Sequence, residues 1–296
     1  MKKRYKIWIV KNLQSNFITN LVILIFSIII LSECVSHTAG YLTPQSQVIK
    51  QQYWRANSYL FGCFMEGTKY QTPTFQFDSR KPGSTILILG GTHGNEPAGF
   101  EAAYRLLETL SKNPITAGKV FIVPEANRVA VAQKSRRISV PEEIDIERGN
   151  LNRCYPGGPE GLPMEQEAYQ ITQFIRRQNV DLFIDLHESP KFHLESRDAK
   201  GNYYGLGQTL IYTPNEEATW LAMIVADELN ARIPEKIKQF SLVEHLIESS
   251  AAWSAGKHFN IPSFTVETCK KLPLEERIQY QLEILNSILR EQGMIQ

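Results

Sequence analysis

Short apolar runs separated by longer amphipathic segments constrain the fold of this chain more than any other feature of its sequence. The runs are continuous rather than alternating, which favours strands covered on both faces. The expected strands are Thr85–Leu89, Val120–Val123, Val180–Leu186, Thr209–Tyr212 and Ser263–Val266. The expected helices are Pro97–Leu110, Met164–Arg177, Glu216–Asn230 and Leu274–Arg290. We therefore predict an α/β fold, a single domain whose mixed, mostly parallel central sheet has helices on both faces.

The N-terminal part of the chain differs in composition from the rest. Residues 1–36 begin with a basic stretch and continue into the apolar run "LVILIFSIIIL", which is the form of a signal peptide; an uncleaved membrane anchor is the alternative. We expect an irregular leader over residues 37–80 and the main folded domain over residues 81–296. The protein is accordingly expected to be exported, whether periplasmic, secreted or attached to a membrane through its N-terminal segment.

The charge balance excludes one class of partner. Lys and Arg number 32 against 31 Asp and Glu, so the formal net charge is +1. A protein that binds nucleic acid through its phosphates needs a basic surface, and this composition does not indicate one. We expect no nucleic acid partner.

Polar residues follow three of the expected strands directly. His93 and Glu96 lie in "GGTHGNE" after the first strand, His187 follows "VDLFIDL" and Glu267 follows "SFTV". Ligands of open α/β sheets bind at the carboxyl ends of the strands. Two imidazoles and one carboxylate are ligands of a catalytic Zn²⁺, with the fourth position left for water. We predict that His93, Glu96 and His187 bind one zinc ion; a phosphate loop is the competing interpretation, but no Gly-Lys-Ser or Gly-Lys-Thr follows the glycines.

Four motifs in order carry a family resemblance. "GGTHGNE", "NLNR" at Asn150–Arg153, "DLHE" at Asp185–Glu188 and "FTVET" at Phe264–Thr268 resemble the zinc carboxypeptidase superfamily, and most closely its aspartoacylase and succinylglutamate desuccinylase branch. The resemblance covers roughly residues 84–290. It implies His93, Glu96 and His187 as zinc ligands and Glu267 as the general base.

The resemblance also implies roles for residues around the metal. Asn152 and Arg153 match the pair that holds a substrate carboxylate, and a planar guanidinium suits that group. An arginine upstream of this pair would stabilise the oxyanion. Arg136 and its neighbour Arg137 are the candidates, with Arg148 as a third.

Two further expectations rest on position in the sequence. Asp185 lies two residues before His187 on the same side of a strand, where it would either orient that ligand or sit at the end of the sheet. The segment 191–214, with Tyr204, is expected to line the specificity pocket because it follows His187. The alternative for that segment is a surface loop with turn glycines.

The chain departs from the family pattern at two points. Asn150 stands where the superfamily commonly has an aspartate that pairs with the first zinc histidine; asparagine can accept the imidazole N–H but brings no charge. Only 29 residues follow Glu267, where the branch carries a further C-terminal β domain. The expectation is a more open cleft.

The favoured function is an exported zinc-dependent hydrolase that cleaves an amide bond near a free carboxylate, a metallocarboxypeptidase or muropeptide type of metalloprotease. N-acyl-amino-acid deacylation by the same chemistry is the alternative. The substrate would be a small peptide or an acyl-amino acid. A catalytically inactive binding protein of the same fold is a third hypothesis, which the presence of Glu267 and all three ligands disfavours.

Overall fold

The computed structural model describes residues 47–48, 50–51, 59–195, 197–201 and 204–296. The segment 1–36, predicted to be a signal peptide or an anchor, lies outside the described residues. Within the described ranges, none of the helices has the length and apolar character needed to cross a membrane.

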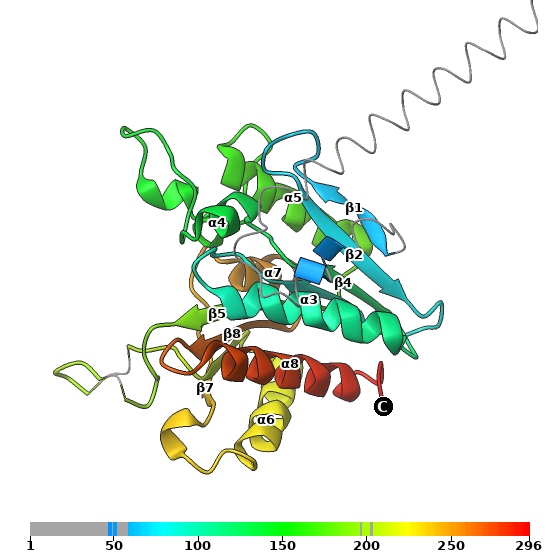
Figure 1. Ribbon diagram of the computed structural model, residues 1–296, viewed down its shortest axis with the longest axis vertical. Helices are drawn as coiled ribbons and strands as arrows, with labels where there is room; N and C mark the ends of the chain where they lie inside the picture. The colour runs from blue at the N-terminus through cyan, green and yellow to red at the C-terminus, as the bar shows by residue number, and fades with distance from the viewer. Residues whose placement is uncertain (1–46, 49, 52–58, 196, 202–203) are drawn as a thin grey trace, which may run out of the picture. The chain divides into compact units, whose positions relative to one another are not determined.

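The centre of the fold is a mixed, eight-stranded sheet with the strand order β1-β2-β4-β3-β5-β8-β6-β7 (Figure 1). The strands are β1 (Leu60–Phe64), β2 (Thr72–Asp78), β3 (Thr85–Leu89), β4 (Lys119–Val123), β5 (Leu182–Ser189), β6 (Thr209–Tyr212), β7 (Ser241–Val243) and β8 (Ser263–Cys269). The four central strands β4, β3, β5 and β8 run parallel, whereas β2 and β6 join them antiparallel. The carboxyl ends of β3, β5 and β8 therefore meet at one edge of the sheet.

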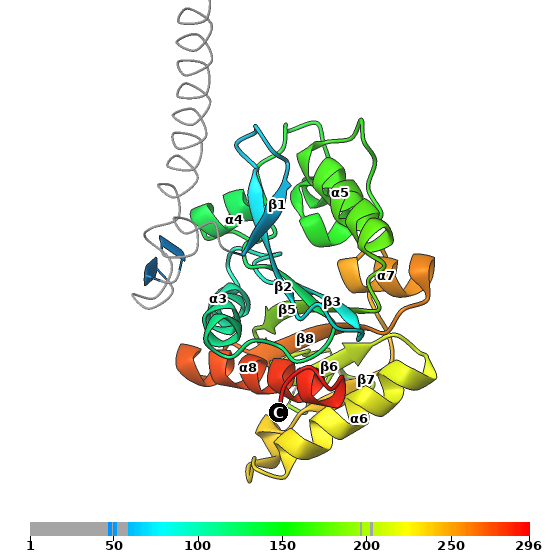
Figure 2. The ribbon, with the colours of Figure 1, turned by 90° about the vertical axis from the view of Figure 1, so that its right-hand side faces the viewer.

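Helices cover both faces of this sheet. Helix α3 (Pro97–Lys112) packs against α8 (Leu274–Glu291), and α8 packs against α6 (Glu216–Asn230). On the other face, α5 (Pro163–Gln178) packs against α7 (Ala251–Phe259) (Figure 2). The predicted α/β fold, with one mixed sheet between two helical layers, is confirmed.

The continuous apolar runs of the sequence are the buried strands. All five residues of β3 and all eight of β5 are buried. Successive side chains of a strand point to opposite faces, and Phe183 of β5 packs in the core cluster with residues of α5 and α7. Asp185 and His187 share the face of Phe183, because they follow it at intervals of two. The sheet thus turns these two polar groups toward the α5 and α7 layer.

The order in which strands are added to the sheet reverses at β3. Strand β4 lies on one side of β3 and β5 on the other, and both are parallel to it. Such a switch point leaves a crevice at the carboxyl ends of the strands. The segment after β3 and the end of β5, which hold the predicted ligands, meet there.

The structure corrects the sequence-based boundaries in several places. The prediction of an irregular leader over residues 37–80 is wrong for its second half, because β1 and β2 form an antiparallel pair there and join the sheet through β4. Two short helices, α4 (Arg128–Gln133) and α7, and the three-residue β7 were not predicted. The long loop between α4 and α5, residues 135–162, contains two single 3₁₀ turns, η1 (Ile146–Gly149) and η2 (Leu151–Arg153). A third, η3 (Lys236–Lys238), precedes β7.

Candidate metal centre

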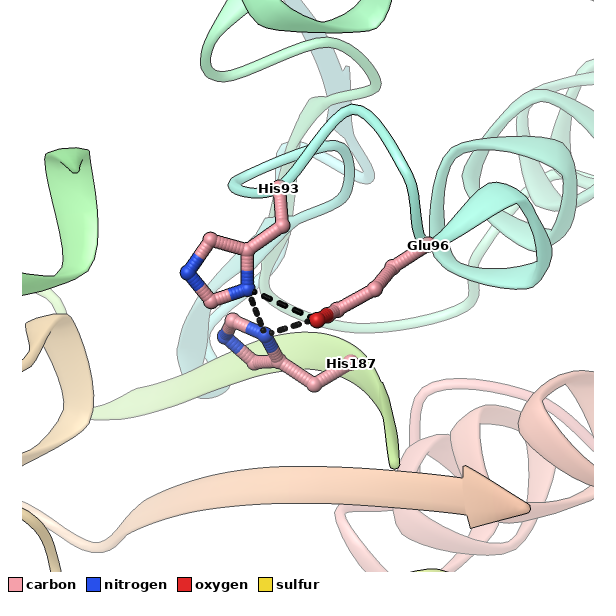
Figure 3. Close-up of side chains that lie close together, drawn as sticks. All are labelled: His93, Glu96 and His187. Atoms are coloured by element: carbon pink, nitrogen blue, oxygen red, sulfur yellow. Dashed lines mark hydrogen bonds and ion pairs between the residues drawn. The ribbon is translucent and has the colours of Figure 1, made fainter. Parts of the chain in front are cut away.

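The three predicted zinc ligands lie together. One nitrogen of His93, one nitrogen of His187 and a carboxylate oxygen of Glu96 all lie within 4.8 Å of one another, and all three residues are buried. His93 Nδ1 is 3.0 Å from Glu96 Oε1, and His187 Nδ1 is 2.9 Å from Glu96 Oε2. Both rings turn their Nδ1 atoms toward the carboxylate (Figure 3). This cluster could hold a metal ion.

The turn after β3 owes its shape to glycine. Gly91 has a φ of +67°, in the left-handed region that favours glycine. A Cβ atom at Gly94 would lie 1.9 Å from the carbonyl oxygen of Ala130 in α4. The turn therefore packs directly against the α4 backbone, which holds His93 in place, and Glu96 follows at the N-cap position of α3, where its side chain makes no capping hydrogen bond and is directed to the cluster.

Each histidine also contacts a side-chain oxygen through its other ring nitrogen, Nε2. His187 Nε2 lies 2.8 Å from Asp185 Oδ2, and Asp185 in turn accepts a hydrogen bond from Thr92. His93 Nε2 lies 3.0 Å from Asn150 Oδ1, so the asparagine accepts the imidazole N–H as the sequence suggested. Of the two alternatives for Asp185, the structure supports the one that orients His187.

Burial and neighbouring charges set the protonation of the cluster. Burial lowers the pKa of His93 and keeps its ring neutral. Burial alone would raise the pKa of Glu96, but His93 and His187 hold it well below its usual range. Burial opposes a charge on His187 too, yet the Asp185 and Glu96 carboxylates outweigh it and raise that pKa. An ionised carboxylate and two imidazoles fit the ligand preferences of Zn²⁺, and binding a cation would displace the His187 proton.

The cluster opens into a cavity of about 180 Å³. Its polar lining includes the three ligands together with Arg136, Asn152, Arg153, Glu188, Ser250, Thr265 and Glu267, and its apolar lining includes Leu206, Ile211 and Ile247. Glu267 of β8 pairs with His187 of β5 in the sheet register. Burial raises the pKa of Glu267 to about 8, and its Oε2 atom has no hydrogen-bond partner among the described residues. A buried carboxyl with a free oxygen and a pKa near neutral can both take up and release a proton at about pH 7, as an acid-base group does.

The arginines of the long loop differ in their partners. Arg136 Nη1 lies 3.0 Å from Glu96 Oε1 and 3.3 Å from His93 Nδ1, at the edge of the cavity. Arg148 pairs with Glu165, and Arg137 pairs with Glu147, both outside the cavity lining. Arg153 lines the cavity and donates to the carbonyl of Asn152 at 2.7 Å, with no acidic partner in the described part of the chain. The position of Arg136 fits the predicted role, whereas those of Arg137 and Arg148 do not.

The pocket prediction for Tyr204 is wrong. Its side chain is 55% exposed, its hydroxyl lies 3.1 Å from the Lys191 amine, and it is not among the residues that line the cavity. The rest of that prediction is partly right, because Leu206 and Ile211 from the same segment do line it. Sequence reasoning missed Ser250, Thr265 and Ile247. Of these three, only Thr265 could have been predicted from the sequence, because it lies two residues before Glu267 and shares its side of the strand.

The sequence of this chain is similar to those of known proteins. Residues 82–195 match the family described as succinylglutamate desuccinylase/aspartoacylase catalytic domain. The family resemblance is thereby confirmed. A stretch of 108 residues is 36% identical to the N-alpha-acetyl-L-2,4-diaminobutyric acid deacetylase of Halomonas elongata, covering 36% of this chain and 29% of that protein.

Solved structures share the fold at low sequence identity. Product-bound cell shape determinant Csd4 from Helicobacter pylori has a TM-score of 0.63 at 19% identity, covering 75% of this chain and 55% of that one. The same protein in its mDAP-bound form, described as a D,L-carboxypeptidase, has a TM-score of 0.60 at 20% identity over 72% of this chain and 51% of its own. An aspartoacylase family protein from Mesorhizobium loti has a TM-score of 0.56 at 23% identity over 76% of this chain and 62% of its own. This chain thus resembles a deacetylase in sequence and a D,L-carboxypeptidase in fold, and it spans 29% to 62% of the lengths of these proteins.

Proposed function

We propose that the protein is a zinc-dependent hydrolase that cleaves an amide bond near the free carboxylate of a small peptide, in the manner of a carboxypeptidase. One observation carries the proposal: a His-Glu-His cluster with ligand atoms within 4.8 Å lies in the same cavity as a buried carboxyl, Glu267, and an arginine, Arg153, which has no acidic partner among the described residues. The fold shared with a D,L-carboxypeptidase supports it.

The proposed chemistry divides among four kinds of group. His93, Glu96 and His187 would hold the ion, which supplies a water of lowered pKa and polarises the amide carbonyl. Glu267 accepts the proton of the attacking water and passes it to the leaving nitrogen as the C–N bond breaks. Arg153, beside Asn152, binds the substrate carboxylate. Arg136 donates toward the carbonyl oxygen, where negative charge develops.

Deacylation of N-acyl amino acids is a second candidate. The 36% identity to a deacetylase and the family match over residues 82–195 favour it. Both reactions hydrolyse an amide bond. In the carboxypeptidase reaction the acyl side of that bond is a peptide, whereas in deacylation it is a small acyl group. Product analysis by mass spectrometry on a mixture of peptides, muropeptides and acyl-amino acids separates them, since each gives different products.

Metal analysis and hydrolysis with and without a chelator test the common chemistry. We expect purified protein to contain zinc, to lose activity with chelator and to regain it when zinc is restored. Glu267→Gln should lower kcat by about 10² to 10⁴-fold, the usual contribution of a general base. Tyr204→Phe is the matched control, because this exposed residue lies outside the cavity lining and loss of its hydroxyl should leave the rate unchanged. Activity that survives chelation, or a fast Glu267→Gln variant, excludes the mechanism.

We also propose that the protein is exported. The basic stretch and apolar run of residues 1–36 support this, and a periplasmic or extracellular place suits a hydrolase of cell-wall peptides. Cell fractionation followed by intact-mass measurement tests it. Recovery of the full-length chain from the cytoplasm would contradict export, and a retained N-terminus in the membrane fraction would favour an anchor over a cleaved signal.

A further inference from the structure

We infer that Glu147 is a positioning residue for the metal ligand His93, acting through the side chain of Asn150. The inference rests on the proposed function only in taking His93 as a ligand. It concerns the position where the sequence departs from its family, with an amide in place of a carboxylate.

The tautomer of His93 decides whether this residue can bind a cation. Its Nδ1 atom faces the ligand cluster, 3.0 Å from Glu96 Oε1 and 3.1 Å from His187 Nδ1. A neutral imidazole can bind a cation through Nδ1 only if its proton is on Nε2. That proton needs an acceptor, and Asn150 Oδ1 lies 3.0 Å away. The ligand is therefore competent only while Asn150 presents its oxygen.

Glu147 and the backbone of Asn152 fix the orientation of the Asn150 amide. An asparagine can present either its oxygen or its NH₂ group, and the NH₂ group would face the His93 N–H as donor against donor. Asn150 Nδ2 lies 2.7 Å from Glu147 Oε2, and a carboxylate can only accept. The backbone N–H of Asn152 donates to Asn150 Oδ1 at 3.1 Å. Both contacts direct the amide oxygen to His93.

Glu147 is itself held in place by neighbouring residues. It lies in η1, where its backbone N–H donates to Asp145 Oδ1 at 3.0 Å, and Arg137 pairs with its other carboxylate oxygen. The hydrogen bond from Asn150 lowers the pKa of Glu147 further below its ordinary value, so the group is a carboxylate at neutral pH. Its side chain is 42% exposed, so water screens its charge at the distance of the metal site. We therefore assign its effect to orientation of the amide.

A structural role of Glu147 is the competing explanation. In that case the ion pair with Arg137 would only anchor the loop, and removing Glu147 would disturb His93 whatever residue occupied position 150. The two explanations differ in an Asn150→Asp background. A carboxylate at position 150 accepts the His93 N–H through either oxygen and needs no partner to orient it.

The experiment measures zinc affinity by competition with a chromogenic chelator, independently of activity. The proteins are wild type, Glu147→Ala, Asn150→Asp and the double variant. We expect Glu147→Ala to weaken zinc binding about tenfold, as is usual when a ligand loses its outer support. In the Asn150→Asp background the same change should cost nothing, or should tighten binding because it removes a like charge. A coupling between the two positions is thus expected.

Glu143→Ala is the matched control, because Glu143 is exposed on the same loop and its removal changes the charge equally. It should leave zinc affinity unchanged. If Asn150→Asp fails to fold, Glu147→Gln replaces it: the glutamine oxygen can still accept from Asn150, so this variant should stay within about threefold of wild type. Equal losses for Glu147→Ala in both backgrounds, or for Gln and Ala alike, overturn the inference. Wild-type protein that binds no zinc would instead contradict the proposed function.

Discussion

At the scale of single residues, the Glu267 carboxyl combines burial with a pKa raised from 4.5 to about 8. In metal-free protein at pH values between these two, the folded state keeps a proton that the unfolded state has lost, so stability from this group falls as pH rises through that window. We expect Glu267→Gln, which does not titrate, to remove this loss and to make the metal-free protein more stable than wild type at pH 8 by about 1–3 kcal/mol. Urea unfolding at pH 5 and pH 8 with chelator measures it; equal pH dependence in both proteins would contradict it.

Arg153 is the residue proposed to bind the substrate carboxylate. Its guanidinium lines the cavity without an acidic partner among the described residues. A lysine keeps the charge but loses the planar fork that binds a carboxylate through two hydrogen bonds. We expect Arg153→Lys to lower kcat/KM about 10–100-fold, mainly through KM. Arg148→Lys, in an arginine that pairs with Glu165 outside the cavity, should change it less than about twofold in steady-state kinetics; equal effects would remove Arg153 from the site.

At the scale of elements, the turn between β3 and α3 joins the candidate metal site to the packing of α4. A Cβ at Gly94 would meet backbone atoms of Ala130 and Val131, which cannot turn away as a side chain can. We expect Gly94→Ala to lower the free energy of unfolding by about 3 kcal/mol or more and to weaken zinc binding with it. Gly158→Ala, where no atom lies within 4 Å of the added carbon, should stay within about 0.5 kcal/mol in urea unfolding. A well-folded Gly94→Ala variant with normal zinc affinity would contradict this.

Elements also show how far sequence alone could predict this molecule. The bounds of β3, β6 and α6 match the prediction, because continuous apolar runs and a long amphipathic repeat are signals of the segment itself. The missed β7 has three residues and is a strand only through its pairing with β6. The missed β2 contains Pro73 and Gln76, and its pairing with β4 decides its structure.

The same distinction applies to the site. His93, Glu96, His187 and Glu267 stand at strand ends inside motifs, and the sequence predicts them. The contact of Asn150 with Glu147 joins two turns of an irregular loop. Such a loop has no repeating pattern of apolar residues, so the sequence does not predict how the Asn150 amide is oriented. Likewise, Arg136 and Arg137 are adjacent in sequence, and only the path of the loop turns one toward Glu96 and the other toward Glu147.

At the scale of the whole molecule, the ligands tie together distant parts of the chain. His93 and Glu96 follow β3, whereas His187 lies 91 positions after Glu96 on β5. The carboxylate of Glu188 next to it accepts from the backbone of Ala98 at the start of α3 and pairs with Arg277 of α8. Glu188 points to the opposite face of β5 from His187, so these contacts fix the end of β5 to the layer of α3 and α8 while His187 faces the layer of α5 and α7. We therefore expect a metal bound at the cluster to affect the cooperative unfolding of the domain.

Zinc should accordingly stabilise the folded protein by mass action. A ligand that binds only the folded state at about 1,000 times its Kd adds about 4 kcal/mol. For a domain of this size that corresponds to a rise in Tm of about 8–16 °C. Calorimetry of chelator-stripped protein with and without added zinc measures the shift. His93→Ala should abolish most of it, because a pair of remaining ligands binds weakly. His245→Ala removes a histidine that is exposed and outside the cluster, and it should leave the shift intact. A shift of equal size in His93→Ala would mean that zinc binds elsewhere, and the assignment of His93, Glu96 and His187 as the ligand set would be wrong.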